Sequence, residues 1–370
     1  MSGSPGQVSG PANISGNNSY VTDQWIRKWE LVVYNPSSSG PGAGQALILS
    51  AGSDSPGSES LRMKFQIKGS MIPTPNVAVI RVYNPNPETV MRMVNEFARV
   101  TLSAGYLNGR FGTIFDGWIT QFRFGGETAV DKFVELYAQD GDLAFSHATV
   151  NRVLMPGFNS PQSIGEAISQ AMVDKGVPSA DLSNLGIVPT ARPVVMYAMA
   201  TDLLDVITRT TNTIWNIQNG KLVVIPAKGA NLANETLVVN ALTGLIGFPT
   251  LTNDGLEFRT LMNPFASYGQ YVRINNAEIN QIVAGVGGGK TSGVTTVLTP
   301  QFGMNFYAST SDDNTYFIAN VGFEGDTRGQ DWYTDYIGIA VDVKSNTTTA
   351  AQGIFPTPSQ VLSQDGVSTP

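Results

Sequence analysis

Short runs of β-branched and aromatic residues fill the first part of the chain, from Trp25 to Val150, and Gly, Pro or Asn separates them. Runs of this length and composition predict strands. They are WELVVYN, LRMKFQIKG, NVAVIRVYN, RVTLSAGY, GTIFDGWITQFRF and AVDKFVELYAQD. The stretch ALILS at 46–50, between segments rich in Gly and Ser, predicts a long flexible hairpin or insertion.

One predicted helix interrupts these strands. Asn86 suits the N-cap, Pro87 suits the first helical position, and Glu88 suits the positive end of the helix dipole. The apolar positions that follow predict one buried face, formed by Val90, Met91, Val94, Phe97 and Ala98.

From about residue 151 to residue 230 the pattern predicts a small α+β module. Pro161 begins a predicted helix, and Gly176 is its stop. The apolar face of that helix comprises Ile164, Ala167, Ile168, Ala171 and Met172. A second helix is predicted from Thr201, with Leu203, Leu204 and Ile207 facing inward. The segment TIWNIQNGKLVVIP then predicts a hairpin with Asn219-Gly220 at its turn.

Strand patterns return from about residue 231. The segment GLIGFPTLTNDGLEFRTLMNP predicts a hairpin around Asp254-Gly255. Four further strand-like runs follow it: YGQYVRI, GVTTVLT, TYFIANVGFEG and WYTDYIGIAVDV.

The two β regions contain a similar hairpin. Residues 118–137 align with residues 317–336 without a gap. The alignment pairs Ile119 with Ile318, Phe124 with Phe323, Gly126 with Gly325, Glu127 with Asp326, Thr128 with Thr327, Phe133 with Trp332, and Tyr137 with Tyr336. A second similarity precedes each hairpin, since RVYNP leads to RVTL and TLMNP leads to YVRI. Similarities kept in the same order predict two copies of one β domain around the α+β module.

Composition narrows the classes of function. A chain of 370 residues with 42% hydrophobic residues predicts two or three domains with real cores. Charged residues make up 14% and the net charge is -7, which disfavours a protein that grips phosphate backbones. Because there is no cysteine and one histidine, thiolate chemistry, zinc–thiolate sites and multi-histidine metal sites are excluded.

The segment AGVGGGKTSG at 284–293 is one glycine short of a phosphate-binding loop, because Ala284 replaces the first glycine. Such a loop needs a helix that begins at its Lys-Thr, here Lys290-Thr291. The residues that follow, SGVTTVLTPQFG, are β-branched and interrupted by Pro and Gly, so they predict a strand. We therefore favour a loop between strands, with a P-loop NTPase as the alternative from a different class.

Titratable residues outside this segment do not form a catalytic pattern. His147 lies in LAFSHATV, a predicted strand, and has no evident Ser or Cys partner, which favours a structural histidine. Asp326, Arg328 and Asp331 share one turn, where a salt bridge is favoured over an acid–base group. The carboxylates Glu127 and Asp131 likewise give no sign of an acid–base group. The sequence predicts no catalytic, cofactor-binding or metal-binding residue, no cofactor and no enzymatic activity.

The remaining candidates favour structure as well. The basic residues Arg81, Arg92, Arg99 and Arg110 do not form a stripe with interleaved aromatic residues, so specific nucleic-acid binding has little support. The tryptophans at 25, 118, 215 and 332 fit core and interface anchors. No apolar run approaches the ~20 residues that span a bilayer, and the N-terminus lacks a signal-peptide pattern.

Four stretches give the chain a resemblance to the baseplate hub proteins of contractile-tailed bacteriophages: FDGWITQFRF, GLIGFPTLTNDGLEFRTLMNP, YVRI and VGFEGDTRGQDWYT. The most specific part is the turn at 325–329, followed by Trp332. The chain departs from the family at Phe323 and Glu324, where hub proteins often carry a histidine before this turn. With the domain arrangement, the resemblance covers most of residues 25–343.

The resemblance implies a mainly β fold with an α+β insertion, in which two duplicated tail-tube-like β-barrel domains flank a small α+β module. The expected divisions are 1–20 as a flexible arm, 21–150 and 231–345 as the barrels, 151–230 as the module, and 346–370 as a flexible tail. It further implies a virion protein of the tail baseplate, assembled in the host cytoplasm as a homotrimer.

Such a trimeric ring would adapt a six-fold tail tube to a three-fold spike and would line the DNA channel. The implied partners are the tail tube protein or a tube initiator above, the spike protein below, other baseplate proteins and the tape measure. DNA would pass without specific binding, and this chain would not enter a membrane. The tube-like part of a secretion-system spike is the structural alternative, and a cell-wall hydrolase of a baseplate is a further enzymatic one.

Overall fold

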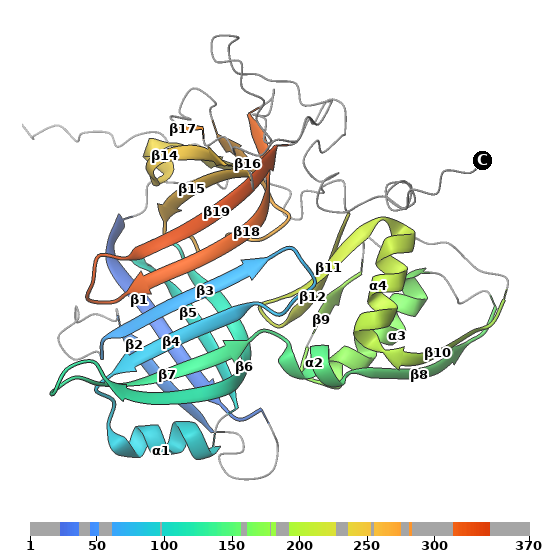
Figure 1. Ribbon diagram of the computed structural model, residues 1–370, viewed down its shortest axis with the longest axis horizontal. Coiled ribbons are helices and arrows are strands. Elements are labelled where there is room, and N and C mark those ends of the chain that lie inside the picture. Colours follow the sequence, from blue (N-terminus) through green and yellow to red (C-terminus); the bar gives the residue numbers. More distant parts are fainter. Residues whose placement is uncertain are drawn as a thin grey trace, which may run out of the picture.

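The computed structural model describes residues 23–36, 45–51, 61–96, 98–156, 161–177, 179–182, 192–226, 236–252, 255–274, 281–282 and 314–340. These residues form a 14-stranded sheet and a smaller module of helices and short strands beside it (Figure 1). The predicted mainly β fold with an α+β insertion is therefore confirmed.

The first β region supplies seven strands and one helix to this arrangement. They are β1 (Asp23–Tyr34), β2 (Ala46–Ala51), β3 (Met63–Ser70), β4 (Val77–Tyr83), α1 (Pro87–Glu96), β5 (Arg99–Asn108), β6 (Phe111–Gly126) and β7 (Lys132–Gln139). The segment ALILS is thus a strand, β2, which pairs antiparallel with β1.

The module follows in the chain and has two small sheets, β8 with β10 and β11-β12-β9. Its elements are α2 (Asp142–His147), β8 (Thr149–Leu154), α3 (Pro161–Val173), β9 (Ser179–Asp181), β10 (Val194–Met199), α4 (Ala200–Thr211), β11 (Thr213–Gln218) and β12 (Lys221–Pro226). Asn219 and Gly220 have φ of 49° and 73°, which is the left-handed turn that the Asn-Gly pair predicted.

The second β region completes the large sheet. It contains β13 (Leu237–Val239), the 3-10 turn η2 (Ala241–Thr243), β14 (Leu245–Thr252), β15 (Gly255–Leu261), β16 (Tyr271–Ile274), β17 (Gln281–Ile282), β18 (Thr315–Asp326) and β19 (Trp332–Ala340). The predicted strand GVTTVLT lies outside the described residues.

One order of five antiparallel strands occurs twice in the sheet. In the first region it is β3-β4-β7-β6-β5, and in the second it is β14-β15-β19-β18-β16. The bulge in the long strand also recurs, between Ile119 and Gln121 in β6 and between Ile318 and Asn320 in β18. The duplication seen in the sequence is therefore present in the strand topology.

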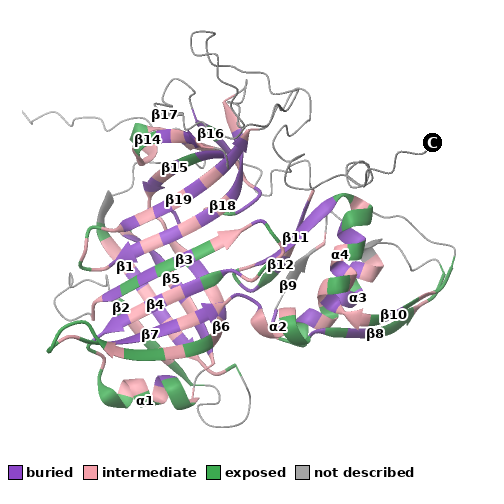
Figure 2. Cartoon of the chain, viewed as in Figure 1, coloured by how far each residue is buried: buried purple, intermediate pink, exposed green. Residues whose placement is uncertain are grey.

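The two copies are joined edge to edge and are not separate closed barrels. β18 of the second copy pairs antiparallel with β3 of the first, from Asn320 opposite Ser70 to Asp326 opposite Lys64. Within the described residues the main path of the sheet runs openly from β17 to β2. One hydrophobic core extends through both copies and a second lies in the module, as the buried positions in Figure 2 show.

The gapless alignment is wrong by one residue on the returning strand. In the first hairpin Gly126 pairs with Lys132, whereas its counterpart Gly325 pairs with Trp332. The turn of the second hairpin is one residue longer, because Asp326 N–H bonds to the Asp331 carbonyl where Glu127 N–H bonds to that of Asp131. The counterpart of Phe133 is therefore Tyr333, and that of Trp332 is Lys132.

Two aromatic rings nevertheless cover glycines across the hairpins. The Phe133 ring lies over Gly125, and the Trp332 ring lies over Gly325. They are on opposite faces of the sheet, since Trp332 belongs to the core and packs edge-on against Phe65 with ring centroids 5.5 Å apart. Phe133 is instead covered by the Arg81 guanidinium, 4.2 Å from its ring centroid.

The three predicted helices are present as α1, α3 and α4, whereas α2 was not predicted. The predicted buried face of α1 and the predicted strand at His147 differ from the structure. The Asn86 side chain accepts from Glu88 N–H, as expected of an N-cap, yet the buried residue of α1 is Met93. Met91 is 61% exposed and Val94 is exposed too, while Phe97 lies outside the described residues. His147 was predicted on a strand and is instead the last residue of α2.

Replacing Trp332 by Ala should lower the free energy of unfolding by about 3–5 kcal/mol, because the side chain is 2% exposed and its loss leaves a cavity against Phe65. Urea unfolding of the dilute chain measures this. The control Met91→Ala removes an exposed side chain and should change stability by less than about 0.5 kcal/mol. Equal effects of the two substitutions would contradict this description of the core.

Candidate assembly interface

Side-chain contacts reinforce the joint between the two copies at the end of β18. Arg62, just before β3, contacts Asp326 at the end of β18 with both guanidinium branches, at 3.2 and 2.6 Å. Thr327 fixes the same point, because its hydroxyl accepts from Met63 N–H at 2.9 Å. Burial alone would raise the pKa of Asp326, but Arg62 and the N–H groups of Arg328 and Gly329 lower it below its usual value.

A second arginine reaches the same turn from β1. Arg27 donates to the carbonyl oxygens of Asp326 at 2.6 Å, Gly329 at 2.7 Å and Gln330 at 3.1 Å. Its guanidinium also lies over the Trp332 ring, 5.4 Å from the centroid. The turn at 326–331 therefore connects the end of β18 with β1 and with the start of β3. The Asp326 carboxylate is occupied by these structural contacts.

The predicted salt bridge in this turn is present, but its partner differs from the expected one. Asp326 pairs with Arg62, which is distant in sequence, and accepts from the backbone N–H groups of Arg328 and Gly329. Glu127 and Asp131 lie in the corresponding turn of the first copy. There Asn84 and Thr128 donate to Asp131 and lower the pKa of its carboxyl group.

One face of the sheet carries rows of charged side chains that lie opposite one another on adjacent strands. We call it the polar face and define it by Arg123, Glu135, Arg81, Lys64, Gln66, Glu324, Asp335 and Arg259. Its arginines are close to carboxylates, with Arg81 2.7 Å and Arg123 3.6 Å from Glu135, and Arg259 2.6 Å from Asp335. Carboxylates therefore lie beside each of the three arginines of this face.

The duplication extends to these ion pairs. Arg81 on β4 faces Glu135 on β7, and Arg259 on β15 faces Asp335 on β19, at matching positions of the two copies. Arg259 also lies over the Tyr333 ring, 5.0 Å from its centroid, as Arg81 lies over Phe133. The sequence alignment did not reveal these ion pairs, because the arginine and the carboxylate of each pair are far apart in sequence and meet only through strand pairing.

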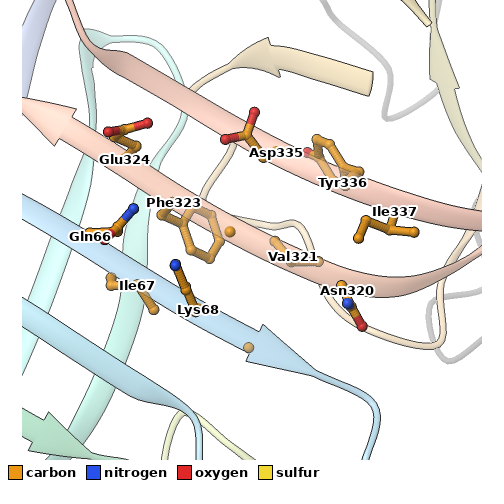
Figure 3. A pocket seen from close by; sticks show the side chains of 12 residues that line it. Gln66, Ile67, Lys68, Asn320, Val321, Phe323, Glu324, Asp335, Tyr336 and Ile337 are labelled. Carbon is orange, nitrogen blue, oxygen red and sulfur yellow. The ribbon is translucent and has the colours of Figure 1, made fainter. Parts of the chain in front are cut away.

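A hollow of about 250 Å³ lies at this face where β3, β18 and β19 meet (Figure 3). It forms where Gly322 lacks a side chain, opposite Lys68 and Asp335. In the described part of the chain, no group of three or more His, Cys, Asp or Glu residues could hold a metal ion.

Buried polar contacts hold the module against the sheet. Arg99 of β5 binds Asp116 at 2.7 and 2.9 Å and the Gly176 carbonyl at 3.0 Å. Asn216 donates to the carbonyl oxygens of Ser70 and Ile72 beyond the end of β3. Asp140, almost fully buried, accepts from Gly220 N–H at 2.9 Å. The module is thus fixed at the ends of β3, β5 and β7.

The other sequence candidates are structural or lie outside the described residues. The segment 284–293 with Lys290 is among the latter. Arg92 pairs with Glu96, and Arg110 donates to Asn263. The tryptophans that the structure describes with their side chains act as anchors, as where Trp215 donates to Asp205 at 2.6 Å. Among the described helices, none has the length and apolar character needed to cross a membrane.

Comparison with known proteins finds similarity in fold but not in sequence. No protein family and no curated protein matches the chain. A tail protein from Neisseria meningitidis has 9% identity and a TM-score of 0.49, with 88% of this chain and 99% of that chain covered. A 43 kDa tail protein of prophage MuSo2 from Shewanella oneidensis has 6% identity and a TM-score of 0.48, with 85% and 97% covered.

A component of the type VI secretion system of Escherichia coli is also similar. It has 10% identity and a TM-score of 0.45, with 78% of this chain and 75% of that chain covered. Two tail proteins, one of them from a prophage, and a component of a type VI secretion system are among the solved structures similar to this chain in fold.

Stability should depend on pH through Asp140. Burial raises the pKa of Asp140 from 3.8 to about 7, despite the hydrogen bond from Gly220. The folded chain then holds a proton that the unfolded chain releases, so stability should fall between about pH 4 and pH 7 and change little on either side. At about 1.4 kcal/mol per pKa unit the fall is on the order of 4 kcal/mol.

The variant Asp140→Asn cannot ionise and should lose this dependence in urea unfolding measured from pH 4 to pH 7. Asp131→Asn is the control: its lowered pKa confines any effect to more acidic solutions. An unchanged fall in stability for Asp140→Asn would contradict the assignment.

Proposed function

We propose that this chain is a structural hub protein of a contractile phage tail. Three copies would form a ring in which six β units, two from each chain, continue the six-fold symmetry of a tail tube. The same ring has three-fold symmetry for a spike below. The tube-like part of a secretion-system spike remains the structural alternative.

The observation that carries this proposal is the edge-to-edge joint between two copies of one strand order. In the chain, β3 of the first unit pairs with β18 of the second, fixed by Arg62 and Arg27. Repeated units that pair through one edge of a sheet can continue around a ring, and a closed ring leaves no open edge. The resemblance of FDGWITQFRF and VGFEGDTRGQDWYT to hub proteins supports the same assignment.

The polar face suits the wall of a channel for DNA. Phosphates bind Lys and Arg by releasing counterions, so a wall of unpaired basic residues would retain DNA. Here Arg81, Arg123 and Arg259 lie beside carboxylates, which leaves Lys64 as the remaining basic residue of the defined face. The chain as a whole has a net charge of -7. We propose that this face lines the lumen and lets DNA pass without specific binding.

The remaining parts of the proposal concern the surroundings. We propose two β domains at 21–150 and 231–345, the module at 151–230, and terminal arms at 1–20 and 346–370. The neighbours would be the tube protein or its initiator above, the spike below, other baseplate proteins and the tape measure. The chain would act in the tail baseplate of the virion, after assembly in the host cytoplasm, without enzymatic activity.

The purified full-length chain should form particles of three copies at high concentration, measured by native mass spectrometry, with a ring in class averages. Three copies follow from two units per chain and a six-fold tube. A monomer at every concentration, or a ring of six chains, would contradict the hub assignment, because six chains would leave the duplication without a purpose.

The enzymatic alternative makes a separate prediction. Lys290→Ala should leave assembly unchanged, because the residues after Thr291 predict a strand in place of the helix a phosphate loop requires. Isothermal titration of the wild type with ATP and GTP should show no saturable binding. Binding that the substitution abolishes would favour an NTPase over a hub.

A further inference from the structure

In the second copy, β18 pairs with β3. The equivalent strand of the first copy, β6, has no partner strand at the equivalent edge among the described residues. Residues 121–126 of β6 correspond to residues 320–325 of β18, with the same bulge just before them. Both segments pair on one side with the returning strand of their hairpin. On the other side β18 pairs with β3, whereas among the described strands none pairs with this part of β6.

The side chains at the edge without a partner strand are more exposed than their counterparts at the paired edge. Phe124 is 53% exposed, and its counterpart Phe323 is 4% exposed because β3 covers it. Phe122 is half-buried, whereas its counterpart Val321 is buried. An edge strand with an exposed aromatic side chain is a ready template for another strand. The first copy therefore exposes at β6 the edge that β3 covers at β18 of the second copy.

The strand that fits this edge is identified by the duplication. β14 corresponds to β3, because each lies beside the strand that carries the paired arginine, Arg259 in β15 and Arg81 in β4. Matching the registers makes Thr250, Leu251 and Thr252 the counterparts of Gln66, Ile67 and Lys68.

Among the strands that the structure describes, the far edge of β14 pairs with β17, over two residues, Gln281 and Ile282. In the single chain six strands separate β14 from β6, and the two strands are not paired with each other. A second copy can therefore supply β14 to this edge.

We infer that β14 of a second copy of this chain pairs antiparallel with residues 121–126 of β6, and that β17 leaves that edge when it does. The register follows the joint within the chain: Leu251 lies opposite Phe124 as Ile67 lies opposite Phe323, and Thr252 lies opposite Arg123 as Lys68 lies opposite Gly322. This inference rests on the proposed ring and specifies its contact between chains.

Cysteine pairs test the register directly, because the chain has no cysteine of its own. The variant Arg123→Cys with Thr252→Cys should form disulfides between chains and give a covalent trimer on a non-reducing gel. Residues directly opposite one another in antiparallel strands have Cα atoms about 4.5–5.5 Å apart, which a disulfide can span. Both positions are on the polar face, where substitution leaves the core intact.

The matched control is Lys68→Cys with Gly322→Cys, at the corresponding positions of the joint within one chain. An added Cβ at Gly322 meets nothing closer than 3.6 Å, so the cysteine fits. This variant should form its disulfide within single chains, seen as a mass loss of two hydrogens without covalent oligomers. If the control closes and wild-type particles contain three copies, but the test pair stays reduced, the pairing of β14 with β6 is wrong and the hub proposal stands.

A second variant does not depend on disulfide geometry. Phe124→Asp places a charge in the inferred contact and should convert the particles to folded monomers, because the side chain is half exposed in the single chain. Val206→Asp adds the same charge at an exposed position of α4 and should leave the particles intact. Particles of unchanged mass for Phe124→Asp would overturn the inference, and wild-type chains that never associate would overturn the inference and the hub proposal together.

Discussion

The pairing of β3 with the second half of β18 determines how the rest of the molecule is arranged. It joins residues more than two hundred positions apart in the sequence and turns two repeated units into one sheet. Long-range pairing has a large entropic cost, which local side-chain contacts at the joint help to offset. Arg62, Arg27 and Thr327 provide these contacts, while Phe65 and Trp332 pack behind them.

Once this joint is set, the two faces of the sheet have separate roles. The inner face buries Trp332, Phe323 and their neighbours in one continuous core. The polar face keeps its arginines beside carboxylates, and the repeated pairs Arg81–Glu135 and Arg259–Asp335 show that both copies preserve the arrangement. The exposed pair Arg259–Asp335 contributes ~0–1 kcal/mol to stability. In the pair Arg81–Glu135 the carboxylate is buried, so the arginine is needed to compensate its charge.

Local patterns in the sequence predicted the local elements well. The Asn86-Pro87 start of α1 and the Asn219-Gly220 turn rest on interactions within a few residues. The apolar face of α3 was visible as a helical period, and its residues lie in the core of the module. The pattern predicted the face of α1 only in part: Val90 packs against the core, but Met91 and Val94 are exposed and Met93 is the buried residue. The prediction placed His147 on a strand, but it ends the short helix α2. The apolar neighbours of His147 fit both kinds of element.

Contacts between segments that are distant in the chain could not be predicted from the sequence. The repeat was visible in it, but one extra residue in the turn at 326–331 moved the returning strand by one position and changed the partner of Trp332. The closed barrels expected from the resemblance are replaced in the described residues by one open sheet. Nor could composition reveal that Asp326 meets Arg62, since sheet pairing alone brings them together.

The central claim is that β6 and β18 present equivalent edges, one open and one covered. Amide hydrogen exchange of residues 121–126 and 320–325, followed in dilute monomer and in assembled particles, tests it most directly. We expect fast exchange in residues 121–126 and slow exchange in residues 320–325 of the monomer, and slow exchange in both segments of the particle. Equal protection of the two segments in the monomer, or an unprotected 121–126 segment in the particle, would contradict the account.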